Sequence, residues 1–193
     1  LIFYLYLYTY RRKQLDNLRH VFFFVILMAI ITSGAFLVLQ YAPVGYIYLI
    51  PFAWCPVIAR VFYDSRTAIF VHIITVFIVS IAVPAPYVFL FMQVLTGIVA
   101  VISLRDMTQR AQLAKTAAFI LLAYSLLYTA VTVLTTGSIT DLDYRLYFYF
   151  AINAVLVICS YGLIFLFERT FGLLSNITLV ELTNVNSNLM LEF

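Results

Sequence analysis

The chain has 193 residues, of which 65% are hydrophobic and only 10% are charged, with a net charge of +3 and a mean hydropathy of +1.08. These values exclude an ordinary soluble globular domain. Only helices and closed barrels satisfy every backbone group in lipid, and the apolar runs here are continuous rather than alternating. The sequence therefore predicts an all-α fold, a polytopic helical transmembrane bundle.

The first ten residues, LIFYLYLYTY, stop at a cluster of cations and show neither an initiator Met nor a signal-peptide pattern. We interpret residues 1–10 as the end of a transmembrane helix that enters from outside the cell. Residues 11–20 are then a basic cytoplasmic loop. On this interpretation an extracytoplasmic segment precedes Leu1.

Residues 21–167 are expected to form a six-span membrane bundle, because each of six apolar runs can cross once. The runs cover residues 21–39, 44–59, 67–83, 87–104, 116–135 and 146–167. A hydrocarbon core about 30 Å thick needs roughly 20 helical residues, so the second, third and fourth runs are short. They either tilt little or form paired half-spans, and the sequence leaves open whether residues 67–104 form two full spans.

The cations indicate the orientation of the bundle. Only Arg145 lies in a loop on the opposite side from the other ten Lys and Arg residues, which are Arg11, Arg12, Lys13, Arg19, Arg60, Arg66, Arg105, Arg110, Lys115 and Arg169. The positive-inside rule places these ten, and the tail after Phe167, in the cytoplasm. Because this distribution accounts for the net charge, we expect no nucleic acid as a partner.

The second run contains the segment IPFAWCP, with Pro51 and Pro56. Each proline removes a backbone hydrogen bond, so the helix is expected to be kinked or locally unwound, with carbonyls left free. A static kink is one interpretation. The other is a hinge that shifts when an outside signal arrives and passes this shift to the last span.

His72 is the clearest ionisable residue within a span. Its neutral imidazole can form a hydrogen bond to another helix, or the residue can transfer a proton or bind a ligand. Asp64 and Arg66 lie in a short turn, where they can pair with each other, cap helices or contact a downstream domain, unless the turn is simply solvated. The candidate signal-transmission residues are Pro51, Pro56, Asp64, Arg66 and His72.

Other polar and small residues in the spans favour helix packing rather than substrate binding. Gln93 and Asn153 are expected to form hydrogen bonds between helices, and Gly97, Gly34 and Gly162 to allow close helix packing. We predict neither catalytic residues nor a metal site in this chain, because neither histidine precedes an aspartate and the two cysteines are far apart in sequence.

A new helix is predicted after the last span. Thr178 and Glu181 form a Thr-x-x-Glu capping box, and Ile177 and Leu182 are placed for a hydrophobic staple. We interpret residues 168–193 as a cytoplasmic connector to an output domain. The alternative is an amphipathic helix on the inner membrane surface, a role that favours the Lys and Arg residues absent after Arg169.

The segment FERTFGLLSNITLVELTNVNSNLMLEF resembles the junction of the seven-transmembrane HD-domain family, the bacterial membrane-bound phosphohydrolases that cleave cyclic di-AMP. In that family the last span runs through a similar Phe-Glu-x-x-Phe-Gly and Thr-Leu-x-Glu-Leu sequence into the catalytic domain. The matching connector residues are Phe167, Glu168, Phe171, Gly172, Thr178, Glu181 and Leu182. Asn188 departs from the family, which often has Pro there before a Leu-Leu pair.

The second span resembles the same family. The similar pattern within IPFAWCPVIARVFYDSRTAI consists of Pro51, Ala53, Pro56, Asp64 and Arg66. The resemblance to the family covers most of the chain.

The resemblance implies a sensory and anchoring domain that transmits a signal to a C-terminal HD phosphohydrolase absent from this chain. A divalent metal, Mn or Fe, is expected in that missing domain, and no cofactor in this chain. The implied partners are the lipid bilayer and the protein's own extracytoplasmic and cytoplasmic domains, and a homodimer is left open. The implied location is the bacterial cytoplasmic membrane, with several spans and a cytoplasmic C-terminus.

Two other functions stay open from the residues. One is a membrane sensor fused to a different output, such as a kinase or cyclase, for which the same topology would serve. The other is a small transporter, which would favour paired broken helices and charges at the membrane centre. The sensed signal is not predicted.

Overall fold

The computed structural model describes residues 2–11, 18–104 and 111–173, and in this part of the chain it contains helices and no strand. The elements are α1 (Ile2–Tyr10), α3 (Leu18–Tyr41), the 3₁₀ helix η1 (Val44–Leu49), α4 (Trp54–Phe62), α5 (Ser65–Ser80), α6 (Pro86–Ser103), α7 (Ala111–Thr136) and α8 (Tyr144–Phe171). The prediction of an all-α helical bundle is confirmed.

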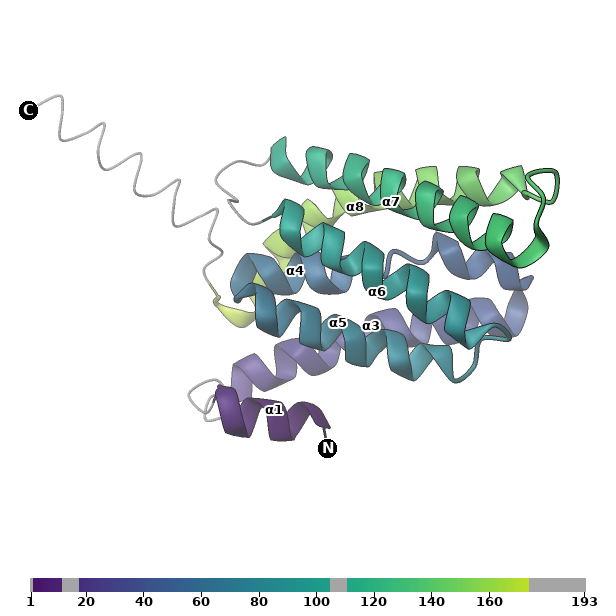
Figure 1. The fold of residues 1–193 in the computed structure, drawn as a ribbon. Coiled ribbons are helices and arrows are strands. Elements are labelled where there is room, and N and C mark those ends of the chain that lie inside the picture. Colours follow the sequence, from purple (N-terminus) through teal and green to yellow (C-terminus); the bar gives the residue numbers. More distant parts are fainter. Residues whose placement is uncertain (1, 12–17, 105–110, 174–193) are drawn as a thin grey trace, which may run out of the picture.

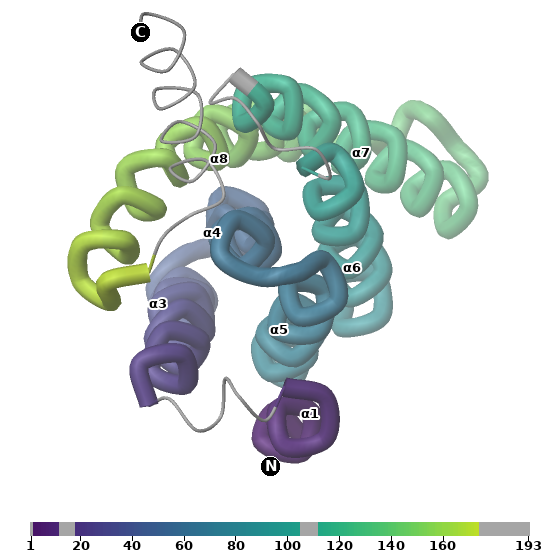
Figure 2. Tube along the Cα trace, turned by 90° about the vertical axis from the view of Figure 1, so that its left-hand side faces the viewer, coloured from purple at the N-terminus to yellow at the C-terminus, as the bar shows by residue number. Residues whose placement is uncertain are grey.

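The helices form a ring around a central helix. α3, α5, α6, α7 and α8 pack side by side in that order, and α8 closes the ring by contacting α3. α4 lies inside the ring, where it contacts α3, α5, α6 and α8 (Figure 2). α1 lies outside the ring, near α5 (Figures 1 and 2).

The sequence of α4, WCPVIARVF, suits this central position. Cys55, Pro56, Val57, Ile58, Ala59 and Val61 are all buried. A helix that is apolar all round is buried on every side. Its charged residue, Arg60, lies in the last turn and donates a hydrogen bond from Nη1 to the Tyr63 carbonyl at 3.1 Å.

Five segments of the described chain are long and apolar enough to cross a membrane: Leu18–Tyr41, Val44–Phe62, Pro86–Ser103, Gln112–Thr136 and Tyr144–Phe171. The apolar helix α5 is shorter, with 16 residues, which span about 24 Å. α5 and α6 pack along each other and run from one end of the bundle to the other (Figure 1). They are therefore neighbours along the length of the bundle.

The outer surface of the ring is apolar. Large hydrophobic side chains are exposed on the ring helices, including Phe22, Leu37, Leu126, Phe148 and Phe165. Polar side chains are buried instead, among them His72, Gln93 and Asn153. This distribution is typical of a helical protein whose surroundings are lipid.

The two ends of the bundle differ in charge. One end, here called the basic end, carries the described cations directly after α1, at the start of α3, on both sides of the α4–α5 turn, near the start of α7 and in the last turn of α8 (Figure 1). These cations are Arg11, Arg19, Arg60, Arg66, Lys115 and Arg169. Arg145 lies at the other end, in the first turn of α8.

Candidate functional site

The second span is broken at Pro51. η1 ends at Leu49, Ile50 is extended with φ −67° and ψ 122°, and α4 begins only at Trp54. The unwinding agrees with the expectation from IPFAWCP. Pro56 does not contribute a break, because it lies in the first turn of α4, where a missing N–H interrupts no helical hydrogen bond.

Asn153 of α8 binds the carbonyls next to this break. Its Nδ2 donates to the carbonyl oxygens of Tyr48 at 3.0 Å and Ile50 at 2.9 Å. On the other side of Pro51, Trp54 Nε1 donates to the Leu156 carbonyl of α8 at 2.7 Å. Thus α8 is hydrogen-bonded to the chain both before and after the break, and the interhelical role expected of Asn153 is confirmed.

His72 of α5 lies between helices in the bundle interior and is 1% exposed. Its Nε2 donates to the Gln93 carbonyl of α6 at 2.9 Å, while Nδ1 has no hydrogen-bond partner among the described residues. A Cβ added at Gly97 would overlap this imidazole. The close helix packing expected at Gly97 is therefore present, and the space is occupied by the His72 ring.

The polar contacts continue from α6 to α7 and α8. Gln93 Oε1 accepts a hydrogen bond of 2.5 Å from the hydroxyl of Tyr124, which is buried in α7. The Tyr124 ring stacks on Phe150 of α8, with a centroid distance of 5.1 Å and an interplanar angle of 10°. Gln93 thus forms the interhelical hydrogen bond that was expected of it.

Several polar atoms in this interior have no hydrogen-bond partner in the described part of the chain. They include His72 Nδ1, Gln93 Nε2, Thr96 Oγ1, Asn153 Oδ1 and Ser160 Oγ. A buried polar group without a partner is costly in an apolar surrounding. The interior therefore retains donors and acceptors that a shifted helix or a water molecule can use.

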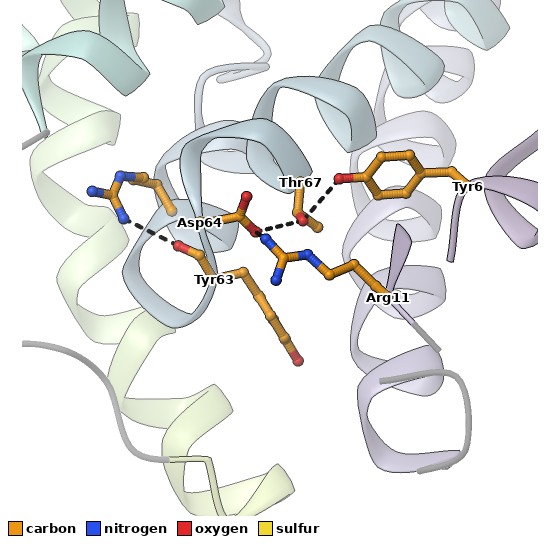
Figure 3. Close-up of polar contacts among 6 residues, drawn as sticks. Tyr6, Arg11, Tyr63, Asp64 and Thr67 are labelled. Atoms are coloured by element: carbon orange, nitrogen blue, oxygen red, sulfur yellow. Dashed lines mark hydrogen bonds and ion pairs between the residues drawn. The ribbon is translucent and has the colours of Figure 1, made fainter. Parts of the chain in front are cut away.

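A second polar cluster lies at the basic end, where α1 meets the start of α5 (Figure 3). Asp64 Oδ1 accepts a hydrogen bond from Thr67 Oγ1 at 2.7 Å and pairs with Arg11 Nη2 at 2.7 Å. The Tyr6 hydroxyl lies 3.1 Å from Thr67 Oγ1. Within the described residues Asp64 thus pairs with Arg11, while Arg66 is exposed beside it.

The environment of Asp64 favours its ionised form. Partial burial raises the pKa of the carboxyl, but the hydrogen bond from Thr67 and the interactions with Arg11 outweigh burial and hold the pKa below its ordinary value. The Asp64–Arg11 ion pair is therefore intact at neutral pH.

Tyr63 connects the same turn to α3. Its hydroxyl lies 2.7 Å from His20 Nδ1, and its ring packs against Phe24 with a centroid distance of 4.5 Å. The α4–α5 turn thus contacts α1 through Asp64 and α3 through Tyr63.

The connector residues that the structure describes lie at the end of α8. Phe167 and Phe171 pack against Phe23 of α3, with centroid distances of 5.1 and 5.8 Å. Gly172 ends the helix with φ 63°, and its N–H donates to the Glu168 carbonyl at 2.9 Å, which is the usual role of glycine after a helix C-terminus.

The predicted capping box at Thr178 and Glu181, and the staple residue Leu182, lie outside the described residues. In the part of the chain that is described, no group of three or more His, Cys, Asp or Glu side chains could hold a metal ion.

Sequence reasoning missed two features of these clusters. It did not predict that the Asn153 side chain donates to the carbonyls beside Pro51, and it did not predict the ion pair between Arg11 and Asp64. The contact of Asn153 could have been predicted, because a break in a helix leaves carbonyls free, and free carbonyls need a hydrogen-bond donor inside the membrane.

The apolar outer surface, the membrane-length helices and the buried polar contacts define a multi-pass helical membrane protein. A family model described as "7TM receptor with intracellular HD hydrolase" matches residues 1–175. The chain therefore belongs to this seven-transmembrane HD-associated family, of which it represents the transmembrane region. No curated protein and no solved structure matches the chain.

Proposed function

We propose that this chain transmits a signal through the membrane to an HD phosphohydrolase that hydrolyses cyclic di-AMP. The description of the family supports an intracellular HD hydrolase as the output. The resemblance of residues 167–193 to the junction of cyclic di-AMP phosphohydrolases supports the substrate. The divalent metal, Mn²⁺ or Fe²⁺, and the hydrolytic residues are assigned to the HD domain.

The proposed orientation places the basic end in the cytoplasm of a bacterial cell, because cations near span ends favour the cytoplasmic side. α8 then runs toward the cytoplasm and ends at Phe171, directly before the segment that joins the output domain. Family membership favours this receptor function over the transporter, and the HD output over a kinase or cyclase.

One observation supports transmission most strongly: α8 is bonded to the broken second span on both sides of Pro51. A signal that changes the break must change the surroundings of Asn153 and of the Leu156 carbonyl. Because an unpaired amide is costly in the bundle interior, the loss of the two carbonyls favours a new arrangement of α8 that gives Asn153 other partners. Asn153 Oδ1, which has no partner among the described residues, is available to such an arrangement.

The residues of α8 that follow Asn153 connect the break to the segment before the output domain. α8 is one uninterrupted helix from Tyr144 to Phe171, so a shift near Asn153 displaces its last turn. Phe167 and Phe171 rest on Phe23 of α3 through aromatic contacts. Packed contacts of this kind have discrete arrangements, as a two-state switch requires.

The test is hydrolysis of cyclic di-AMP by the intact protein in lipid nanodiscs with Mn²⁺, comparing the wild type with Asn153→Leu. We expect the wild type to hydrolyse cyclic di-AMP and Asn153→Leu to change the basal rate by at least about threefold, since a coupling of 1 kcal/mol corresponds to about fivefold. Ser125→Ala serves as the control, because among the described residues the Ser125 hydroxyl donates to the Leu121 carbonyl of its own helix and the Ser125 carbonyl accepts from Thr129 of the same helix.

Two results would reject separate parts of the proposal. A folded, metal-loaded intact protein that leaves cyclic di-AMP uncleaved would reject the substrate. Equal rates for the wild type, Asn153→Leu and Ser125→Ala would reject transmission through the break and α8.

A further inference from the structure

A pocket of about 400 Å³ lies at the basic end between α1 and α5, lined by Tyr6, Tyr10, Arg11 and Arg66. It adjoins the Asp64–Thr67 cluster, toward which Tyr6 and Arg11 point (Figure 3). Two guanidinium groups and two phenol rings thus line one hollow. Arginine guanidinium groups present planar donor pairs that match the oxygens of a phosphate group.

Among the described residues, Arg11, Asp64 and Arg66 at the pocket carry an excess of one positive charge. Arg11 is neutralised by Asp64, which it contacts at 2.7 Å through Nη2. Arg66 is exposed and makes no ion pair with any residue that the structure describes. An anion in the pocket would therefore provide Arg66 with a counter-ion.

The position of the pocket indicates where this anion comes from. α1 ends at Tyr10 and α5 begins at Ser65, so the pocket lies where two apolar helices leave the hydrocarbon. Phospholipid headgroups occupy this level, and tyrosines are enriched there. On the same side of α1, Ile2 lines an apolar groove together with Phe70 and Ile73 of α5, and this groove offers an apolar surface to acyl chains.

We propose that this pocket binds the phosphate group of an anionic phospholipid and that the bound lipid holds α1 against the start of α5. The same two elements are already joined by Tyr6, which stacks on Phe70 with a centroid distance of 4.1 Å and contacts Thr67. A zwitterionic lipid carries the same phosphate, but its ammonium group would be repelled by the excess positive charge. The pocket should therefore prefer anionic lipids.

This inference is independent of the proposed function, and its test does not use hydrolysis. The intact protein is delipidated in a neutral detergent and titrated with short-chain phosphatidylglycerol, and bound lipid is counted by native mass spectrometry. Phosphatidylcholine and soluble glycerol phosphate are titrated in parallel, because glycerol phosphate offers the same chemistry without acyl chains.

Arg66→Gln should raise the Kd for phosphatidylglycerol about tenfold, as expected when one charge-assisted phosphate contact is lost. Arg169→Gln is the matched control, because it removes an equal charge from an exposed position in the last turn of α8, at the same end; its Kd should stay within about twofold. Arg66→Lys should fall between the wild type and Arg66→Gln, since it keeps the charge but loses the planar donor pair.

Several outcomes would overturn the proposal. Equal weakening in Arg66→Gln and Arg169→Gln would show attraction by overall charge rather than by a site. Equal affinity for phosphatidylcholine would remove the anionic preference, and displacement of the lipid by glycerol phosphate at similar concentration would identify a soluble phosphate ligand. Unchanged binding in an Arg66→Gln variant with wild-type thermal stability would show that the lipid does not bind in this pocket.

Discussion

The bundle interior around α4 and the contact between α1 and α5 hold polar groups in opposite ways. In the interior, neutral side chains such as His72 and Asn153 are almost fully buried, and several of their atoms have no partner among the described residues. At the basic end, Asp64 and Arg11 are about one-third exposed and form an ion pair. Low dielectric makes the interior contacts expensive to break, whereas solvent screens the ion pair.

This comparison predicts that changes in the interior have larger effects on stability than changes at the basic end. The largest effect is expected at Gly97, where an added Cβ overlaps the buried His72 imidazole. Gly97→Ala should reduce the free energy of unfolding by about 1–3 kcal/mol through overpacking. The measurement is reversible unfolding in mixed SDS and detergent micelles.

Gly162 provides the control for this change, because a Cβ placed there would meet no atom within 4 Å apart from the adjacent residues and backbone of its own helix. Gly162→Ala should leave stability unchanged or raise it slightly. Adding His72→Ala to Gly97→Ala should restore part of the loss, since it removes the overlapping ring. Equal stability of Gly97→Ala and Gly162→Ala would show that the imidazole does not occupy this space.

A smaller effect is expected at Tyr124. Tyr124→Phe removes the donor to Gln93 Oε1 but keeps the ring stacked on Phe150. Interhelical hydrogen bonds in membrane proteins contribute about 0.6 kcal/mol on average and at most about 1.7 kcal/mol, so the loss should lie between about 0.6 and 1.7 kcal/mol. Tyr87→Phe is the control because Tyr87 is highly exposed; losses of the same size in both variants would contradict an important Tyr124–Gln93 contact.

The smallest effect is expected for the ion pair at the basic end. Asp64→Asn should cost less than about 1 kcal/mol at pH 7, because both side chains are partly exposed. Asp64 has a lowered pKa in the folded protein, so its contribution is complete above its ordinary pKa near 4 and is lost as the pH falls through the lowered value.

The pH dependence sharpens the comparison. The stability difference between the wild type and Asp64→Asn should stay constant from about pH 7 to pH 5 and shrink below about pH 4. Thermal unfolding of both proteins over this range measures the difference. A difference that already disappears between pH 7 and pH 5 would contradict the lowered pKa.

The sequence was sufficient to predict the bundle and the unwound segment at Pro51. Both follow from local properties, because continuous apolar runs require helices in lipid and a proline removes a backbone donor. The grouping of the cations at alternate helix ends was also readable from the order of the loops. Pro56 was misjudged, because its effect depends on where α4 begins, and this depends on the packing around the break.

The partners of the polar residues could not be predicted. Asn153 and Ile50 are 103 positions apart, and their contact depends on which helices close the ring. In a soluble helix the polar face would indicate this arrangement, but a membrane helix is apolar on its lipid side and on its packed side. The central position of α4 and the pairing of Arg11 with Asp64 could not be predicted either, because both depend on which helices pack against each other.

The break at Pro51 also affects how the chain can be assembled in a membrane. Its partners on α8, Asn153 and the Leu156 carbonyl, lie more than 100 residues later in the chain. During synthesis the second span is therefore made long before the groups that satisfy its free carbonyls and its indole N–H. The segment from Val44 to Phe62 can therefore reach its final packing only after α8 has been synthesised. Until then, the free carbonyls beside Pro51 need other hydrogen-bond donors during membrane insertion.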